Sequence, residues 1–340
     1  LIQALIGWSR EVELEAILFG LILNLRYLVF MVLLWIITKE TDLIHRLWQK
    51  ILLIPAAIVV SFGLLQQFLL PKDFLTHFGY GVDTIPATHT VDEKENLMRL
   101  QSTLRGPNPL GAYLVLIITT VFNRLLLAGK NYKASILGAS ALSVLFFSYS
   151  RSGLVGLVIS IFVLLNIKFP HLRAKILITS GLFLILSLGG LMMFRDVDQF
   201  QNIAYHADEN STSSSNQVRL DSISNNAKDV IKHPFGGGVG SAGPASQRTD
   251  NPKIAENYYI QIAQEVGIIG LLIYLLVSAM VISGLWFRRQ DQLALILIAS
   301  FAGLTFINLI SHAWTDDTIS LIWWGLAGVA LAMPVKKRTN

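Results

Sequence analysis

The chain has 340 residues, of which 53% are hydrophobic and 14% are charged, and its formal net charge is +5 at pH 7. Because a soluble domain carries about 25% charged residues, this chain lacks the polar surface that a water-facing globule needs. The composition therefore argues against a soluble enzyme, a disordered protein and a nucleic-acid-binding protein. The absence of cysteine excludes disulfides, zinc–thiolate sites and a cysteine nucleophile.

Long apolar runs indicate helices that cross a membrane. A helix needs about 20 apolar residues to span the hydrocarbon core, whereas an outer-membrane barrel would show alternating stretches of about ten residues. The runs in this chain are continuous, so the sequence predicts an all-α fold: a polytopic bundle of transmembrane helices that forms one membrane domain over residues 1–340. Nine spans are expected, in chain order 16–37, 51–70, 109–128, 134–149, 153–169, 175–194, 266–287, 292–310 and 318–334.

Lysine and arginine predict the orientation of these spans. One set of loops, with the adjoining helix ends, carries 14 basic and 3 acidic residues: 38–50, 129–133, 170–175, 288–291 and 335–340. The other loops carry 12 basic and 19 acidic residues. Since positively charged loops stay in the cytoplasm, residues 1–15 are expected outside and the C-terminus inside. The basic charge then reflects topology, and no nucleic-acid partner is expected.

Two large loops, 71–108 and 195–257, are expected on the outer side of the membrane. The cytoplasmic links are too short for a nucleotide-binding domain, so any chemistry is expected to face outward, where ATP and nucleotide sugars are absent. A substrate there has to arrive already activated, most simply on a lipid carrier. Because the chain begins with Leu1, we expect it to be part of a longer product, with an odd number of earlier spans if that product starts inside the cell.

Three arginines lie in or beside the expected spans. Arg26 falls within the first span, where a charge costs about 2.5–3.5 kcal/mol on insertion scales; it could bind a phosphate group in a cavity or extend to the outer interface. Arg105 precedes a Gly-Pro-Asn-Pro bend at a helix start, and could bind substrate or touch lipid headgroups. Arg151 lies in a tight outer turn, where its guanidinium could hold phosphate oxygens in pairs or anchor the helix at the interface.

The outer loop 195–257 holds further polar motifs. Residues 218–232, which include Arg219, have helical spacing and could lie along the membrane surface. Residues 238–243 match Gly-x-Gly-x-x-Gly, but no strand–helix–strand unit surrounds them, so a dinucleotide site is not expected. This glycine-rich run could offer N–H groups to an anion or be a flexible turn. Asp196 and Asp198 match the metal-binding Asp-x-Asp of soluble glycosyltransferases, but they lie in an outer loop without that fold.

Polar residues also gather at the start of the span 266–287. Four of them recur at i+3 or i+4 spacing and so share one helix face: Asn257, Gln261, Gln264 and Glu265. Glu256 precedes them, and it could take a proton from a hydroxyl group or be an acid favoured by the helix dipole. His312 lies in the last outer turn and could add a polar ligand to a site, or be an ordinary turn residue.

Taken in order over residues 99–325, these segments resemble the O-antigen ligase/polymerase family of integral membrane glycosyltransferases. That family shows an Arg before a Pro-Asn turn, a Ser-Arg-Ser/Gly at an outer helix end, and a long external loop with an Arg, a Pro-x-Gly-x-Gly stretch and a His-Asn or Glu-Asn helix start. The matching residues are Arg105-Gly-Pro-Asn-Pro109, Ser150-Arg-Ser-Gly153, Arg219, Pro234-Phe-Gly-Gly-Gly-Val-Gly240, Glu256-Asn-Tyr-Tyr-Ile-Gln261 and Glu265-Val-Gly-Ile-Ile-Gly270. Ligases of the family often have His where this chain has Glu256.

The resemblance implies a C-type glycosyltransferase architecture in the bacterial plasma membrane, with the active site facing the periplasm or exterior. It implies an undecaprenyl-pyrophosphate-linked glycan as donor and a hydroxyl of a glycan, lipid or protein as acceptor. Catalytic roles are expected for Arg151 and Arg219, which would stabilise the leaving diphosphate, and for Glu256, which would activate the acceptor. Substrate-binding roles are expected for Arg26, Arg105, Asn257, Tyr258, Gln261 and His312. Neither a cofactor nor a metal ion is expected.

Two alternatives from other classes stay open at this point: a polysaccharide flippase or other transporter, and a non-catalytic scaffold of cell-envelope assembly. A transporter would need polar residues through mid-membrane and usually has inverted repeats or broken helices. Apart from Asn24 and Arg26, the expected spans are apolar through their centres. A scaffold would tolerate the loss of every outer arginine.

Overall fold

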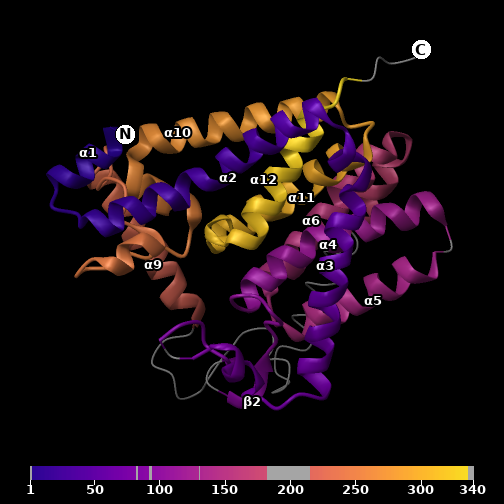
Figure 1. Ribbon diagram of the computed structural model, residues 1–340, viewed down its shortest axis with the longest axis horizontal. Coiled ribbons are helices and arrows are strands. Elements are labelled where there is room, and N and C mark those ends of the chain that lie inside the picture. Colours follow the sequence, from indigo (N-terminus) through magenta and orange to yellow (C-terminus); the bar gives the residue numbers. More distant parts are fainter. Residues whose placement is uncertain (1, 82, 92–93, 130, 182–214, 336–340) are drawn as a thin grey trace. The chain divides into compact units, whose positions relative to one another are not determined.

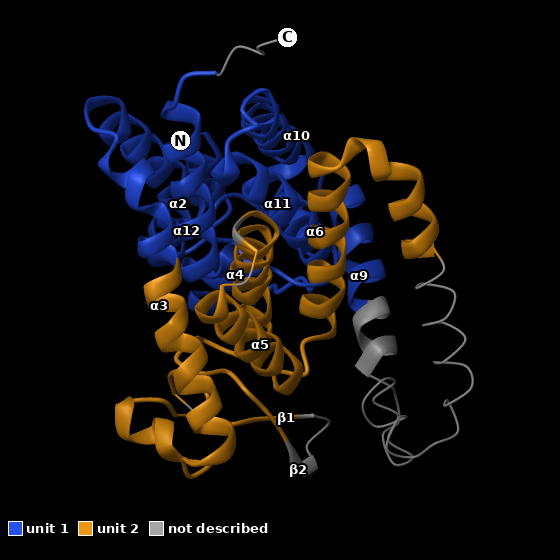
Figure 2. Ribbon diagram, turned by 90° about the vertical axis from the view of Figure 1, so that its right-hand side faces the viewer, with its two compact units in different colours: residues 1–52, 220–340 blue, residues 53–219 orange. Residues whose placement is uncertain are grey.

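The computed structural model describes residues 2–335 except 82, 92–93, 130 and 182–214. The chain divides into two compact units, coloured separately in Figure 2. The first unit contains residues 1–52 and 220–340, and the second contains residues 53–219. Each unit is described by itself.

The first unit is built almost entirely from helices. Helix α12 packs along helix α2 (Figure 1), and the small residues of α12 permit this close approach: Gly325 lies against Phe30 and Leu34 of α2, and Gly328 against the Met31 carbonyl. Small residues at such contacts are typical of helices that pack in membranes. The helices of this unit are α1 (Ile2–Ser9), α2 (Leu14–Glu40), α10 (Tyr258–Phe287), α11 (Gln292–Ile310) and α12 (Asp317–Ala332), with short 3-10 turns η3 (Gly243–Arg248) and η4 (Ala313–Thr315).

A tryptophan cluster forms the core of the first unit. Trp314, Trp323 and Trp324 are fully buried, and the Trp323 and Trp324 ring centroids lie 5.3 Å apart at a steep angle. The Trp323 indole N–H donates to the Leu297 carbonyl and to the Ser300 hydroxyl, both at 3.2 Å. This packing fixes the position of η4 beside α11 and α12.

The second unit is organised around helix α4, whose residues from Leu110 to Ile118 are nearly all buried against α5 and α6. A short antiparallel hairpin precedes α4, with His89 opposite Arg99 and an irregularity between Thr90 and Val91. The elements of this unit are η1 (Phe74–Phe78), β1 (His89–Val91), β2 (Lys94–Arg99), α4 (Pro107–Ala128), α5 (Tyr132–Phe147), α6 (Arg151–Lys168) and η2 (Pro170–Leu172). Two further helices, α3 (Leu43–Phe68) and α9 (Ser215–Lys232), have residues in both units.

The predicted all-α polytopic membrane architecture is confirmed. Six described helices are long and apolar enough to cross a membrane: α2, α3, α4, α6, α10 and α11. Two more of the expected spans are apolar helices of only 16 residues, α5 and α12. The remaining expected span, 175–194, lies mostly outside the described residues. Helix α10 begins at Tyr258, eight residues before the apolar span expected at 266–287, and its first two turns are the polar helix start expected after Glu256.

Candidate functional site

The start of α10 is fixed to the end of α11 through Asn257. The Asn257 side-chain oxygen caps α10 by accepting from the backbone N–H groups of Tyr259 at 2.9 Å and Ile260 at 3.0 Å. Its amide N–H donates to the Leu309 carbonyl at 2.7 Å. Glu256, half-buried, immediately precedes this cap, where the partial positive charge of the helix N-terminus favours a carboxylate. The predicted base therefore stands at a rigidly positioned helix start.

Helix α10 is broken at Gly267, whose φ of 76° and ψ of 175° lie outside the helical region. The break frees carbonyls of the preceding turn, and the glycine-rich loop pairs with them. Gly237 N–H donates to the Gln264 carbonyl at 2.7 Å, and Gly238 N–H donates to the Glu265 carbonyl at 2.9 Å. On the far side of the break, Ile268 N–H donates to the Pro234 carbonyl at 2.8 Å. The glycine motifs at 234–240 and 265–270 thus form one structure: a broken helix and the loop whose N–H groups cap it.

Glu265 is the most buried carboxylate among the described residues of this region, with 3% of its surface exposed. One carboxylate oxygen accepts from Gly240 N–H at 2.8 Å, and the other accepts from the Asn24 side-chain amide of α2 at 3.0 Å. The anion bound by the glycine-rich run is therefore the chain's own carboxylate. The sequence placed Glu265 on a polar helix face but gave no reason to choose it as a site residue. Its position four residues after Gln261, on the same helix face, was the one signal available.

A pocket lies beside Glu265 in the first unit. It has about 270 Å³ of empty space, part of which is open solvent at its mouth. Its walls come from α10, α2, the segment around η3, and η4: Tyr258, Gln261, Glu265, Gly20, Leu23, Asn24, Ala242, Pro244, Ala245, Trp314 and Thr315. Two of the predicted substrate-binding residues, Tyr258 and Gln261, line this pocket, and both are buried. Their binding roles stay predictions.

The Arg26 side chain of α2 contacts the turn that joins η4 to α12. One terminal nitrogen donates to the Thr315 carbonyl at 2.7 Å and forms an ion pair with Asp317. His312 stands immediately before η4. Arg26 follows Leu14, the first residue of α2, by twelve residues. It therefore stands about 18 Å along the helix axis from the start of α2. The Asp317 carboxylate balances part of the Arg26 charge, which weakens the case for Arg26 as a phosphate ligand.

The second unit brings the starts of two helices together. Ser150 caps α6 by accepting from Gly153 N–H at 3.3 Å, and Arg151, half-buried, is the first residue of α6. Gly111, in the second turn of α4, contacts Ser150 and Gly153 so closely that a side chain at Gly111 would collide with Ser150. Arg105, exposed, stands just before α4. The start of α6 thus lies against the second turn of α4, and Arg105 and Arg151 stand at the starts of these two helices, where the helix dipoles favour an anion.

Arg99 was not selected from the sequence, yet it joins these two helix starts. Its Nε–H donates to the Ser148 carbonyl at 3.2 Å, and a terminal nitrogen donates to the Asn108 side-chain oxygen at 2.8 Å. The N-cap of α4 is Gly106, and Asn108 lies in the first turn of the helix. Across the hairpin, burial and then the charge of Arg99 lower the pKa of His89.

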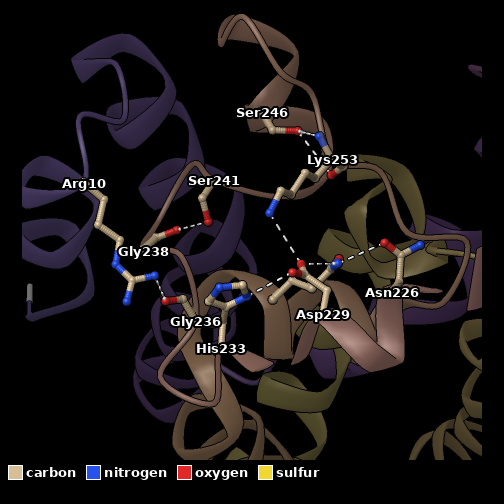
Figure 3. A network of polar contacts seen from close by, with 10 residues as sticks. Arg10, Asn226, Asp229, His233, Gly236, Gly238, Ser241, Ser246 and Lys253 are labelled. Atoms are coloured by element: carbon tan, nitrogen blue, oxygen red, sulfur yellow. Dashed lines mark hydrogen bonds and ion pairs between the residues drawn. The ribbon is translucent and has the colours of Figure 1, made fainter. Parts of the chain in front are cut away.

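A separate polar network links α9 to α10 and the loop after η3 (Figure 3). Asp229 of α9 accepts from Lys253 Nζ at 3.4 Å and from the Gln264 amide at 3.1 Å, and its other oxygen lies 3.0 Å from His233 Nδ1. Burial alone would raise the pKa of Asp229, but the Lys253 charge and these hydrogen bonds lower it overall. The network holds the carboxyl-terminal half of α9, where a helix was predicted over residues 218–232, against α10.

The three predicted catalytic residues do not form one described cluster. Arg151 belongs to the second unit and Glu256 to the first. Arg219 lies within α9, but its side chain is outside the described part of the structure. Asp196 and Asp198 also lie outside the described residues. A shared site for the three therefore stays a prediction.

Comparison with known proteins adds two findings. A family model described as O-antigen ligase matches residues 136–275. A relative from Salmonella muenchen, described as O-antigen polymerase, is 28% identical over 135 residues, which are 37% of this chain and 33% of that protein. The match thus spans about a third of the relative's length. These matches confirm the predicted resemblance of this chain to the O-antigen ligase/polymerase family.

Proposed function

We propose that this chain is part of an integral membrane glycosyltransferase that transfers or polymerises a glycan from an undecaprenyl-pyrophosphate carrier. The acceptor is a hydroxyl group, and the reaction takes place on the outer side of the bacterial plasma membrane. The family supports a membrane glycosyltransferase-like role. The observation that carries the proposal further is the contact between the starts of α4 and α6, where Arg105 and Arg151 stand.

This junction suits a diphosphate for two reasons. The dipoles of α4 and α6 each place partial positive charge at the helix start. A guanidinium adds a full charge and can bind two phosphate oxygens at once. Arg99 fixes the junction by bonding to both Ser148 and Asn108. Arg219 would complete the charge around the diphosphate, as the family motif implies.

The proposed reaction forms one bond and breaks one bond at the anomeric carbon of the donor sugar. The acceptor hydroxyl oxygen attacks that carbon, and the bond from it to the diphosphate oxygen breaks. The bonding electrons leave with the polyprenyl diphosphate, whose added negative charge Arg151 and Arg219 stabilise. The hydroxyl proton passes to Glu256, which later releases it to water. No metal ion or cofactor has a part in this scheme.

The transporter alternative gains one observation, because broken helices are common in transporters and α10 is broken at Gly267. In transporters the freed backbone groups bind the substrate or a coupling ion. At this break they bind other parts of the chain instead: Gly237, Gly238 and, through the Val266 carbonyl at 3.0 Å, the side chain of Gln3. The break therefore favours a rigid scaffold for the polar pocket over a transport site.

Transfer of glycan by purified protein tests the proposal. The full-length protein in lipid nanodiscs is incubated with a fluorescent undecaprenyl-pyrophosphate oligosaccharide and acceptor, and product is separated from donor. We expect transfer without added nucleotide. Arg151→Ala should lower it about 100-fold or more, as expected for loss of a charge that stabilises the transition state. Arg173→Ala, at an exposed arginine on the expected cytoplasmic side, is the matched control and should leave the rate unchanged. Equal rates in both variants would contradict the proposal.

A further inference from the structure

A cavity of about 250 Å³ lies at the other end of α10 from Glu265, where this helix turns into α11. Helices α3, α10 and α11 are long and apolar enough to cross a membrane, so residues at these helix ends lie near the depth of lipid headgroups. The excess of basic residues predicts that this surface is cytoplasmic. The walls come from the start of α3, the end of α10, the turn into α11 and the end of α12, with residues that include His45, Phe287, Arg288, Asp291, Met333 and Pro334.

Two opposite charges face this cavity without being paired to each other. Arg288 and Asp291 both line it, and both are half-buried. A hydrogen bond of 2.8 Å from the Asp291 N–H to the Arg288 carbonyl holds the two residues in one turn. Among the described residues, the ionic partner of Asp291 is His45 at 3.4 Å, and Arg288 has none. The cavity therefore presents a separate positive and negative group.

The Arg288 guanidinium is anchored but keeps donors for a ligand. Its Nε–H donates to the Met333 carbonyl at 2.7 Å, and an Nη1–H donates to the Gly284 carbonyl at 3.0 Å. A guanidinium has five N–H groups, so three remain after these two bonds. Two of them can bind two oxygens of one phosphate group.

The Asp291 carboxylate keeps capacity to accept a further hydrogen bond. Its Oδ1 caps α11 by accepting from Leu293 N–H at 2.9 Å and Ala294 N–H at 3.3 Å, and its Oδ2 lies 3.4 Å from His45 Nε2. Burial alone would raise the pKa of Asp291, but His45 and the two N–H groups lower it overall. The carboxylate is thus charged at neutral pH, and because a carboxylate oxygen can accept more than one bond, Oδ2 can take another donor.

The chemistry of the walls selects a ligand that carries both a phosphate and an ammonium group. A phosphate alone would meet the Asp291 carboxylate, and a cation alone would meet the Arg288 guanidinium. At about 30 Å³ per water, the cavity holds about eight waters, which is enough for a small headgroup. The exposed Phe287 ring adds apolar surface beside it for the glycerol and the first chain atoms. Pockets between membrane spans at the cytoplasmic surface are a typical place for lipid headgroups.

We propose that this cavity binds the headgroup of phosphatidylethanolamine, with its phosphate on Arg288 and its ammonium group on Asp291. The ammonium group donates to Oδ2, and the phosphate accepts from the guanidinium. The bound lipid would join the start of α3 to the ends of α10 and α12. This site does not depend on the proposed function, because none of its residues takes part in the proposed reaction.

Two variants and a matched control test the site. Asp291→Asn removes the negative charge and keeps the helix cap, because Asn and Asp cap helices about equally well. Arg288→Gln removes the positive charge. Arg289→Gln is the control, because Arg289 is the next residue along the chain but stacks on the Trp286 ring and does not line the cavity.

Native mass spectrometry of the full-length protein in detergent, with defined lipids added, measures the affinity for the first lipid bound. We expect the wild type to bind phosphatidylethanolamine about tenfold more tightly than phosphatidylcholine, whose trimethylated nitrogen cannot donate, and than phosphatidylglycerol, which has no cation. Asp291→Asn should remove the preference over phosphatidylglycerol. Arg288→Gln should weaken binding of all three lipids about tenfold, and Arg289→Gln should match the wild type.

Three results would overturn the proposal. The first is an unchanged lipid preference in folded Asp291→Asn, or an unchanged affinity in folded Arg288→Gln; if only one variant folds, by its thermal unfolding curve, that variant decides. The second is tighter binding of phosphatidylglycerol than of phosphatidylethanolamine by the wild type, which would indicate a site for anionic lipids and needs no variant. The third is equal competition by glycerophosphoethanolamine, which lacks acyl chains and should compete only weakly; equal competition would assign the cavity to a soluble ligand.

Discussion

Glu265 of α10 and Asn24 of α2 are joined by a hydrogen bond of 3.0 Å, although they lie 241 residues apart in the sequence. The same carboxylate binds Gly240 N–H at 2.8 Å. One buried side chain thus connects a long helix, the broken helix and the glycine-rich loop that caps the break. This three-way connection makes the start of α10 a defined polar site within the first unit.

Removing the Glu265 carboxylate should destabilise the first unit. Glu265→Leu leaves the buried Gly240 N–H without a partner, at a cost of about 1–3 kcal/mol, and it leaves the half-buried Asn24 amide without this partner at a smaller cost. Adding Asn24→Leu removes one of these unpaired groups, so the double variant should be less destabilised than the sum of the two single variants. Thermal unfolding of the three variants in nanodiscs measures this difference. Additive losses would mean that the two side chains do not interact.

The break in α10 should depend on glycine at position 267. Its positive φ is strained for other residues, and a Cβ there would lie 2.6 Å from the Phe235 carbonyl carbon. We expect Gly267→Ala to cost about 1–3 kcal/mol and to expose the loop 234–253 to protease. Gly81→Ala is the control, because a Cβ at Gly81 meets nothing within 4 Å. Equal protease resistance in the two variants would argue against a required break.

The Asp229 network predicts a pH-dependent contribution to stability. Because the folded state lowers the pKa of Asp229 below its ordinary value of 3.8, the contribution is present above pH 3.8 and is lost as the pH falls through the folded pKa. Asp229 is only partly buried, so the contribution should be at most about 1 kcal/mol.

Asp229→Asn tests this contribution. The variant should unfold at a lower temperature than the wild type at pH 7, and the two should converge as the pH falls from 3.8 through the lowered folded pKa, where the wild-type carboxylate also becomes neutral. Asp250→Asn, at an exposed aspartate in the loop after η3, should match the wild type at every pH. A constant difference between Asp229→Asn and the wild type across this range would exclude an ionic contribution.

The expected orientation in the membrane can be tested cleanly because the chain contains no cysteine. Asn251→Cys and Lys133→Cys place single thiols at exposed positions in an expected outer loop and an expected cytoplasmic loop. The excess of basic residues in the expected cytoplasmic loops predicts that a membrane-impermeant maleimide labels Cys at 251 in intact spheroplasts, and at 133 only after the membrane is opened. The opposite labelling pattern would reverse the topology.

The sequence predicted the helices well because membrane spans are specified by continuous apolar runs, which are local. The polar helix face at the start of α10 was expected, but its contacts were not, because the partners come from elsewhere in the chain: Asn226 and Asp229 for Gln264, and Gly240 for Glu265. Spacing along the sequence places polar residues on one face without identifying the groups that they bind.

The candidate site was predicted only in part for the same reason. Arg105 and Arg151 could be selected because their own neighbours in the sequence form motifs. The contact of Gly111 with Gly153, the bridging role of Arg99 and the pairing of Arg26 with Asp317 depend on packing between distant segments. No local pattern carries that information.

The division of labour between Arg151 and Glu256 is the central claim, and donor affinity measured together with turnover tests it most directly. With the fluorescent lipid-linked donor in nanodiscs, Arg151→Ala should weaken donor binding and also lower turnover by about 100-fold or more, and Arg151→Lys should restore only part of both because it lacks the planar fork. Glu256→Gln keeps the size of the side chain but cannot take a proton, so it should lower turnover and leave donor affinity nearly unchanged. Near wild-type affinity and turnover in both Arg151→Ala and Arg219→Ala would contradict the account.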